Sequence, residues 1–378
     1  MYYIDSLLVK GFRNYNQQQL HFNPRLNILV GENGQGKTNL IEAIYYLTVT
    51  RSFRTNRDQE LANWHDNRFF IKGTFIKSDF KDELQVFYRS GKPLDVKLNR
   101  QSLNRFDYLQ RYPVVVFSPD DLMLIREGPS IRRRFLNLEA SRLSTVYFSE
   151  LRAYQRVLQQ RNSLLKEGYN SRQSLGRRIE PWNDSLVSLG TNIVQARVKI
   201  IKALEKEAKI FFHQMTNANE TLTLDYACGF DYCEGQKETR KNFLDLLSSR
   251  YETELRRGST QVGPHLDDLK ILINGYDTRK FSSQGQKRTA ALALKMAEVS
   301  LFKKIHENWP IILLDDVFSE FDQSRKQYFL EYLKNNTGQC FITTASDLNG
   351  IINNVNREYK IFTVCRGSIK NENSWPGH

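Results

Sequence analysis

The eight residues from Gly31 to Thr38 constrain the fold more than any other part of the sequence. They match a pattern of two glycines separated by four residues and followed by Lys and then Ser or Thr. In such a loop the glycines allow a tight turn whose N–H groups face phosphate oxygens, the lysine adds a positive charge, and the hydroxyl binds Mg²⁺. We therefore predict a nucleotide-binding loop made of Gly31, Glu32, Asn33, Gly34, Gln35, Gly36, Lys37 and Thr38.

The residues on either side of this loop predict a strand before it and a helix after it. Residues 26–30 are mostly aliphatic, which is typical of a buried strand. Leu40, Ile41, Ile44 and Leu47 recur at helical spacing. A strand, a glycine-rich loop and a helix in this order place the phosphates at a helix N-terminus, where the helix dipole favours negative charge.

A second segment, Pro310 to Asp316, supplies the carboxylates that nucleotide hydrolysis requires. Four aliphatic residues suit a central parallel strand, and the two aspartates follow at its carboxyl end, where ligands bind in such sheets. We predict that the Thr38 hydroxyl is a ligand of Mg²⁺ and that Asp315 holds the ion through a water molecule. Asp316 is the predicted catalytic residue that orients or deprotonates the attacking water, with Lys37 as its catalytic partner on the phosphates.

The order of patterns along the chain predicts an α/β protein that is interrupted by a helical arm. Short strand-like segments fill the first part of the sequence and return after about Thr221. Between them, apolar residues recur at helical spacing, and the polar segment 168–178 divides them into two helices. We predict an N-terminal part of the α/β domain at residues 1–125, a helical arm domain at 126–212, and the C-terminal part of the α/β domain at 213–378.

The predicted arm carries most of the net charge of the protein. Residues 126–209 contain 12 Arg and 5 Lys against 7 Glu and 1 Asp, which is +9 of the chain's +13. Two interpretations stay open at this point. The cations could simply keep amphipathic helices in solution, or they could form a surface that binds the phosphates of a nucleic acid.

Composition narrows the class of protein to which the chain could belong. Hydrophobic residues make up 40% of the chain and charged residues 26%, as in folded globular proteins. No apolar run approaches the roughly 20 residues that a membrane-spanning helix needs, and the first residues lack the features of a secretory signal. The four cysteines have no metal-ligand spacing and are too few for a disulfide scaffold. We therefore expect a cytosolic protein without membrane contact.

A third segment, Phe281 to Gln286, shows which kind of nucleotide hydrolase this is. A small polar residue and a glycine precede a predicted helix, so the segment could be either a second anion-binding helix N-terminus or an ordinary helix cap at Ser283. Its position before the Asp-Asp strand, with Ser319-Glu320-Phe321-Asp322 after that strand, resembles the ABC-type ATPases. That resemblance implies that Ser283, Gly285 and Gln286 of one subunit contact ATP held by another.

Within this superfamily the sequence resembles the RecF family, whose ATPase head is shared with SMC proteins. The similarity is carried by residues 11–15, 117–122, 132–136 and 260–265, so it extends over nearly the whole chain. It implies the fold of an ABC-type ATPase head, a P-loop NTPase, with an inserted helical arm. It also implies ATP and Mg²⁺ as cofactors.

The resemblance further implies a function in recombinational DNA repair, replication and the SOS response. An ATP-dependent homodimer would clamp DNA at gaps, single strands and duplex ends and would load recombinase with RecR and RecO. Asp316 stands where most ABC ATPases have Glu, and Thr344 stands where many have His. Both differences favour slow hydrolysis that acts as a switch. Gln284 replaces the first signature glycine, and His265 is either a functional contact or a structural residue.

Two alternatives have different sequence requirements. An ATPase head of a nuclease complex needs a metal-bound nuclease partner or domain, and the chain has no cluster rich in His and Asp that would supply one. A transporter ATPase would dock on membrane helices, and the basic arm argues against it. Base-specific DNA recognition is not expected, because no recognition-helix or zinc-finger motif is present.

Overall fold

The computed structural model describes residues 2–63, 66–77, 80–103, 111–168, 172–233, 235–336, 338–345 and 358–375. Its contacts group the chain into two compact units. The first consists of residues 1–122 and 295–378, and the second consists of residues 123–294. Helix α10 (Gln284–His306) contributes residues to both.

The first unit contains a mostly parallel six-stranded sheet, in the order β15-β14-β3-β13-β12-β8. Strands β3, β8, β12, β13 and β14 run parallel to their neighbours, and β15 pairs antiparallel with β14 at one edge. The four residues of β12 are completely buried, as expected for a central parallel strand. The bounds are β3 (Leu26–Val30), β8 (Val114–Phe117), β12 (Ile311–Leu314), β13 (Cys340–Thr344), β14 (Tyr359–Cys365) and β15 (Ser368–Trp375).

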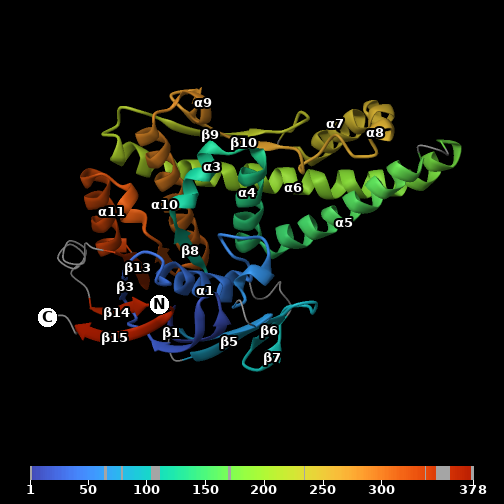
Figure 1. The fold of residues 1–378 in the computed structure, drawn as a ribbon. Coiled ribbons are helices and arrows are strands. Elements are labelled where there is room, and N and C mark those ends of the chain that lie inside the picture. The colour runs from blue at the N-terminus through green and yellow to red at the C-terminus, as the bar shows by residue number, and fades with distance from the viewer. Residues whose placement is uncertain are drawn as a thin grey trace. The chain divides into compact units, whose positions relative to one another are not determined.

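The first unit also contains an antiparallel sheet in the order β2-β1-β4-β5-β6-β7. Helix α1 (Lys37–Val49) contacts strands of both sheets, and Leu40, Ile41, Ile44 and Leu47 on it are fully buried (Figure 1). The strands are β1 (Tyr2–Phe12), β2 (Tyr15–His21), β4 (Arg68–Lys77), β5 (Phe80–Arg89), β6 (Asp95–Leu98) and β7 (Gln101–Ser102). Shorter elements of this unit are η1 (Asp58–Leu61), η2 (Pro119–Leu122), η4 (Val317–Glu320) and α11 (Gln323–Asn336).

The second unit is built on two long helices that pack side by side, α5 (Thr145–Glu167) and α6 (Arg172–Met215) (Figure 1). Strands β9 (Leu222–Ala227), β10 (Asp268–Ile273) and β11 (Tyr276–Asp277) form a small antiparallel sheet, and β9 contacts α6. Around them lie α3 (Met123–Arg126), α4 (Pro129–Leu143), α7 (Gln236–Ser249), α8 (Tyr251–Arg257) and α9 (Thr278–Phe281).

The two helices predicted for the arm are present, but α6 already begins at Arg172, so much of the polar segment 168–178 is helical. The compact units also divide the chain at residues other than the predicted domain boundaries. Residues 213–294, which were predicted to belong to the head, pack with the arm helices. The division into domains at 125/126 and 212/213 therefore stays a prediction, separate from these two units. No helix in the described ranges has the length and apolar composition that crossing a membrane requires.

Candidate nucleotide-binding site

The predicted phosphate-binding loop lies between β3 and the N-terminus of α1. Gly36 is the residue that precedes α1, and no side chain caps the helix there. The Lys37 ammonium donates hydrogen bonds to the backbone oxygens of Gly31 (2.6 Å) and Glu32 (2.8 Å). The loop therefore closes around the lysine, and the free N–H groups of the first helical turn point out of the helix end.

Glycine is required at two positions of this loop. Gly36 has a φ of 118°, and a Cβ atom there would lie 2.7 Å from the side-chain nitrogen of Asn14. A Cβ atom on Gly31, with a φ of 159°, would lie 2.4 Å from the backbone oxygen of Val364. Gly34 differs, because a Cβ atom there would meet no atom within 4 Å. The loop is thus tightly packed on its protein side and open at Gly34.

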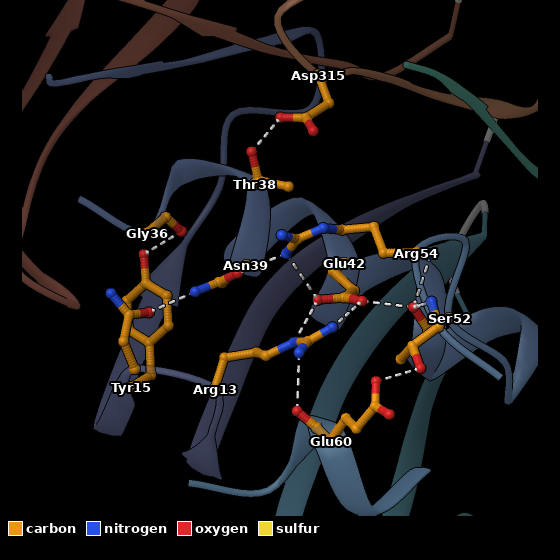
Figure 2. Close-up of polar contacts among 12 residues, drawn as sticks. Arg13, Tyr15, Gly36, Thr38, Asn39, Glu42, Ser52, Arg54, Glu60 and Asp315 are labelled. Atoms are coloured by element: carbon orange, nitrogen blue, oxygen red, sulfur yellow. Dashed lines mark hydrogen bonds and ion pairs between the residues drawn. The ribbon is translucent and has the colours of Figure 1, made fainter. Parts of the chain in front are cut away.

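The carboxylates at the end of β12 lie next to this helix. The Thr38 hydroxyl donates a hydrogen bond to Asp315 (2.8 Å), and the Thr343 hydroxyl lies 3.2 Å from the same carboxylate oxygen. Figure 2 shows the Thr38–Asp315 contact. The backbone N–H of Asp316 donates to the Thr343 hydroxyl (2.8 Å). The structure thus brings Thr38 and Asp315 together as predicted. It places Thr343, one residue before Thr344, in contact with both aspartates.

Burial shifts the pKa values of Lys37 and Asp315, and nearby charges or hydrogen bonds shift each of them in the opposite direction. Burial lowers the pKa of the Lys37 ammonium, and the carboxylates of Asp316 and Asp315 partly offset this shift. Burial raises the pKa of Asp315, although hydrogen bonds from Thr38 and Thr343 lower it. An ammonium and a carboxylate that lack full solvation bind a phosphate and a divalent cation strongly, because little water must be removed.

These residues fit a magnesium nucleotide. Hydroxyl and carboxylate oxygens are ligands that Mg²⁺ prefers, and Thr38 and Asp315 place one of each within 2.8 Å of the other. Lys37 and the uncapped N-terminus of α1 supply the positive charge that a polyphosphate requires.

A buried carboxylate on α1 joins this helix to the segments that contain Arg13, Ser52 and Arg54, and sequence reasoning missed it. Glu42 is fully buried and accepts two hydrogen bonds from the Arg13 guanidinium, at 2.8 and 2.9 Å (Figure 2). Ser52 and Arg54 contact the same carboxylate at 2.5 and 3.5 Å. An acid on the apolar side of a predicted helix was the only signal in the sequence. Its partners come from segments that only the fold brings together.

Residues at the turn between β1 and β2 form hydrogen bonds to the backbone of the phosphate-binding loop. The Asn14 amide donates to the backbone oxygen of Gln35 (3.1 Å), and the Tyr15 hydroxyl donates to that of Gly36 (3.1 Å; Figure 2). The Asn39 amide, on α1, donates to Asn14 (2.8 Å). The segment 11–15, which carried part of the family resemblance, therefore positions the phosphate-binding loop.

Comparison with known proteins identifies the family of this chain. The RecF/RecN/SMC N-terminal domain family matches residues 3–370. The chain is similar to the DNA replication and repair protein RecF of Natranaerobius thermophilus, with 37% identity over 96% of this chain and 97% of that protein. RecF of Halalkalibacterium halodurans is 38% identical over 97% of this chain and 99% of that protein. The chain belongs to the RecF family.

Solved structures agree with this assignment. A structure of the recombination mediator protein RecF with ATP, described as part of the RecFOR pathway, has a TM-score of 0.89 and 34% identity. The match covers 99% of this chain and 98% of that one. An Smc head domain of Pyrococcus furiosus matches with a TM-score of 0.54 at 16% identity and supports the fold alone. The predicted fold class, an ABC-type ATPase head with an inserted helical arm, is confirmed.

The segment that we predicted as an ABC-type signature, residues 281–286, leads into the start of α10. The Ser283 hydroxyl accepts a hydrogen bond from the Gln286 backbone (3.2 Å), and the Gln286 side chain accepts one from the Ser283 backbone (2.7 Å). This reciprocal pair is a capping box. Ser283 is exposed, Gly285 is half-buried, and the Gln284 side chain accepts a hydrogen bond from Arg126. The segment belongs to the second unit, whereas the phosphate-binding loop belongs to the first.

Residues of the segments 132–136 and 260–265, which carried part of the family resemblance, take part in a buried network of the second unit. The His265 ring bonds the Tyr154 hydroxyl (2.7 Å) and the Thr260 backbone oxygen (3.3 Å). Arg197 is buried and donates to the Pro264 backbone oxygen (2.7 Å). Arg132 makes two bonds of 2.8 Å to Asp268. His265 thus has the hydrogen bonds of a structural residue.

The buried arginines reduce the number of cations in residues 126–209 that an external anion could reach. The net charge of +9 for residues 126–209 includes cations that lie inside the second unit. Arg161 donates to Glu254 (2.6 Å), Thr260 (2.7 Å) and Asn183 (2.7 Å), and its side chain is fully buried. Among the residues 126–209 whose side chains are described, four arginines are buried and are not available to an external anion: Arg132, Arg142, Arg161 and Arg197.

Proposed function

We propose that this protein is an ATP-dependent DNA-binding protein of DNA replication and recombinational repair. The proposal rests on one observation above all. Lys37, Thr38 and Asp315 meet at the N-terminus of α1 in a chain of the RecF family. Relatives of this chain are named DNA replication and repair proteins, and a similar structure holds ATP.

The roles we assign follow from the chemistry of each group. Lys37 neutralises the β- and γ-phosphates, and the backbone of residues 31–36 binds phosphate oxygens. Thr38 and Asp315 hold Mg²⁺, which, when bound, offsets phosphate charge and orients the γ-phosphate. Asp316 orients or deprotonates the attacking water. Its shorter side chain, compared with Glu, supports a slow, switch-like ATPase.

We further propose that ATP joins two copies of the chain head to tail. In this arrangement Ser283, Gly285 and Gln286 of one copy bind the nucleotide held by Lys37 of the other. The exposed position of Ser283 supports the proposal, because the residue is accessible to a second molecule.

A more detailed proposal for the function follows from the membership of the chain in the RecF family. The ATP-bound dimer clamps DNA at gaps, where single and double strands meet, and loads recombinase together with RecO and RecR. Its place of action is the nucleoid in the bacterial cytoplasm. The RecFOR pathway named for the related structure supports the choice of partners.

Dimerisation driven by ATP tests this function directly. Sedimentation velocity of the wild-type protein should show a monomer with ADP and a dimer with ATP. Lys37→Ala should stay monomeric with either nucleotide, because the γ-phosphate loses its main cation. A Lys37→Ala variant that still dimerised on addition of ATP would show that the nucleotide site does not control assembly.

A further inference from the structure

The exposed cations of the second unit are distributed unevenly among its helices. Once the four buried arginines are set aside, most of the remaining cations lie on α5, α6 and α7. Where acidic residues alternate with cations, the local fields largely cancel. A polyanion therefore binds best to a face where exposed cations occur without exposed acids.

Helix α5 has such a face. Between residues 149 and 166 its exposed side chains are Arg152, Arg156 and Lys166 together with glutamines and serines, and none is acidic. Glu150 is half-buried and accepts a hydrogen bond from Asn192 on α6 (2.6 Å). Glu167, at the end of the helix, is paired with Arg178 (3.3 Å).

The three cations are free to bind an external group. None of the ion pairs among the described residues includes Arg152, Arg156 or Lys166. The Arg152 guanidinium lies over the Phe148 ring, 5.8 Å from its centroid, which orients it without neutralising its charge. By contrast, Arg161, on the opposite side of the same helix, is fully buried with its carboxylate partner.

Helical spacing places these cations along one line. At about 100° per residue, Arg152, Arg156 and Lys166 lie within a sector of roughly 80°, and Gln159 and Ser163 fall in the same sector. At about 1.5 Å per residue the line is about 21 Å long. This length corresponds to about six phosphates of one strand, which are spaced about 3.4 Å apart along the duplex axis.

Other groups of cations on the neighbouring helices include exposed acids. On α6, Arg177 and Arg178 are followed by exposed Glu180 and Asp184, although the later exposed Lys199, Lys202 and Lys206 have no exposed acid among them. On α7, the exposed cations Lys237, Arg240 and Lys241 alternate with exposed Glu238 and Asp245, and Arg240 lies 3.9 Å from Asp184.

We propose that this α5 basic face, formed by Arg152, Arg156 and Lys166 with the intervening Gln159 and Ser163, binds the phosphate backbone of duplex DNA. The inference deepens the proposed function, on which it rests, by naming the surface that meets DNA. Arginine, lysine, glutamine and serine are all donors to phosphate oxygens. The exposed part of this face contains no aromatic residue on which the bases of a single strand would stack. Binding is therefore independent of sequence and prefers the duplex.

A matched pair of triple variants tests this surface. Arg152→Gln/Arg156→Gln/Lys166→Gln removes three charges from α5. Lys237→Gln/Arg240→Gln/Lys241→Gln removes three charges from α7, where acids are interspersed. Glutamine keeps good helix propensity, so both variants should retain the wild-type melting temperature and ATP affinity. Binding of labelled duplex DNA and of labelled single-stranded DNA, both with ATP, is then measured by anisotropy across a salt series.

The α5 variant should bind duplex at least about tenfold more weakly at 0.1 M salt, because about 0.9 counterions are released per phosphate contact. The slope of log K against log salt should fall by about 2 to 3. The α7 variant should change the slope by less than about 1. Equal losses in both variants would mean that overall charge matters and not this face, which overturns the inference. A loss confined to single-stranded DNA would also overturn it.

Two outcomes separate this inference from the function on which it rests. If the wild-type protein fails to bind DNA in any nucleotide state, the proposed function is wrong and the inference falls with it. If the wild type binds duplex and the α5 variant binds equally well, only the inference is wrong.

Discussion

Asp316 adopts a backbone conformation that an asparagine also tolerates. Its φ is 51°, in the left-handed region that Asn and Asp enter more readily than other residues. Asp316→Asn should therefore keep the bond from its backbone N–H to Thr343 and remove only the carboxylate charge. We expect hydrolysis to fall at least about tenfold, as is typical when a general base is lost, and the ATP-bound dimer to persist. Phosphate release and dimer lifetime measure this.

The matched control for this change is Asp120→Asn, an exposed aspartate of the same unit. Asp120→Asn should leave the rate of phosphate release and the dimer lifetime unchanged. Hydrolysis by Asp316→Asn at the wild-type rate would remove Asp316 from the catalytic role.

His265 makes the stability of the second unit dependent on pH. Because the Thr260 backbone oxygen can only accept, the ring nitrogen Nε2 donates to it, and Nδ1 of the neutral ring accepts from Tyr154. Burial, together with the charges of Arg133, Arg161 and Arg197, lowers the pKa of His265 to about 4, although the hydrogen bond to the Thr260 backbone oxygen acts in the opposite direction. The unfolded chain, with a pKa of about 6.5, binds a proton first as pH falls.

Stability from His265 is therefore complete above about pH 6.5 and is lost as the pH falls towards 4. The loss should reach at most about 3 kcal/mol, at about 1.4 kcal/mol per pKa unit. Urea unfolding of wild type and His265→Gln between pH 7 and 4 measures it. The variant should be less stable at pH 7 and should lose less stability on acidification. Parallel pH profiles for the two proteins would contradict this assignment.

The sequence predicted the residues of the candidate nucleotide site, but it did not predict the buried ion pair on the same helix. Lys37, Thr38 and Asp315 were predicted because the chemistry of phosphate and Mg²⁺ requires fixed residue types at fixed positions. Glu42 and Arg13 were not, because a buried ion pair is recognisable only when both partners are placed in space. The same limit explains why Arg161 and Arg197 were counted as surface charge.

At the level of elements, the start of α10 combines a structural cap with the proposed contact across the dimer. Ser283→Arg should leave ATP binding by the monomer intact and prevent ATP-dependent dimerisation, because its bulk would meet the nucleotide of the other copy. The control is Ser283→Ala, which also removes the cap, at a cost of about 1 kcal/mol, but adds no bulk. Nucleotide affinity by calorimetry and mass by sedimentation distinguish the two. If Ser283→Arg weakened nucleotide binding as much as it weakened dimerisation, Ser283 would belong to the nucleotide site of its own chain.

Helices α5, α6 and α8 are joined by the Arg161 network. Glu254→Ala would leave the Arg161 guanidinium buried without its carboxylate, and both side chains are fully buried in the protein. We expect the free energy of unfolding to fall by about 3–5 kcal/mol. Glu238→Ala, an exposed acid on α7, should change it by no more than about 0.5 kcal/mol. Denaturant unfolding measures both, and a loss below about 1 kcal/mol for Glu254→Ala would show that the network contributes little.

Elements were predicted where a local pattern defines them. The aliphatic run of β12 and the helical period of α1 were sufficient, because each buries a face whose spacing is visible in the sequence. The packing of residues 213–294 with the arm helices was not predictable, because it depends on contacts between distant segments. The bond from Arg197 to Pro264 (2.7 Å) is one example.

At the scale of the whole molecule, the two compact units contain different parts of the proposed mechanism. The first contains Lys37, Thr38, Asp315 and Asp316, and the second contains Ser283 and the α5 basic face. If ATP joins two copies through Lys37 of one and Ser283 of the other, the nucleotide controls how two DNA-binding surfaces are held together. Affinity for DNA should then depend on which nucleotide is bound, since two linked surfaces bind more tightly than one.

Fluorescence anisotropy of a labelled gapped duplex tests this central claim most directly. The protein is titrated with ATP and then with ADP across a salt series, and Lys37→Ala serves as the control that cannot respond to ATP. We predict at least about tenfold tighter binding with ATP, lost steeply as salt rises and absent in Lys37→Ala. Binding that is absent, or equally tight with ATP and ADP, would contradict a nucleotide-controlled DNA clamp.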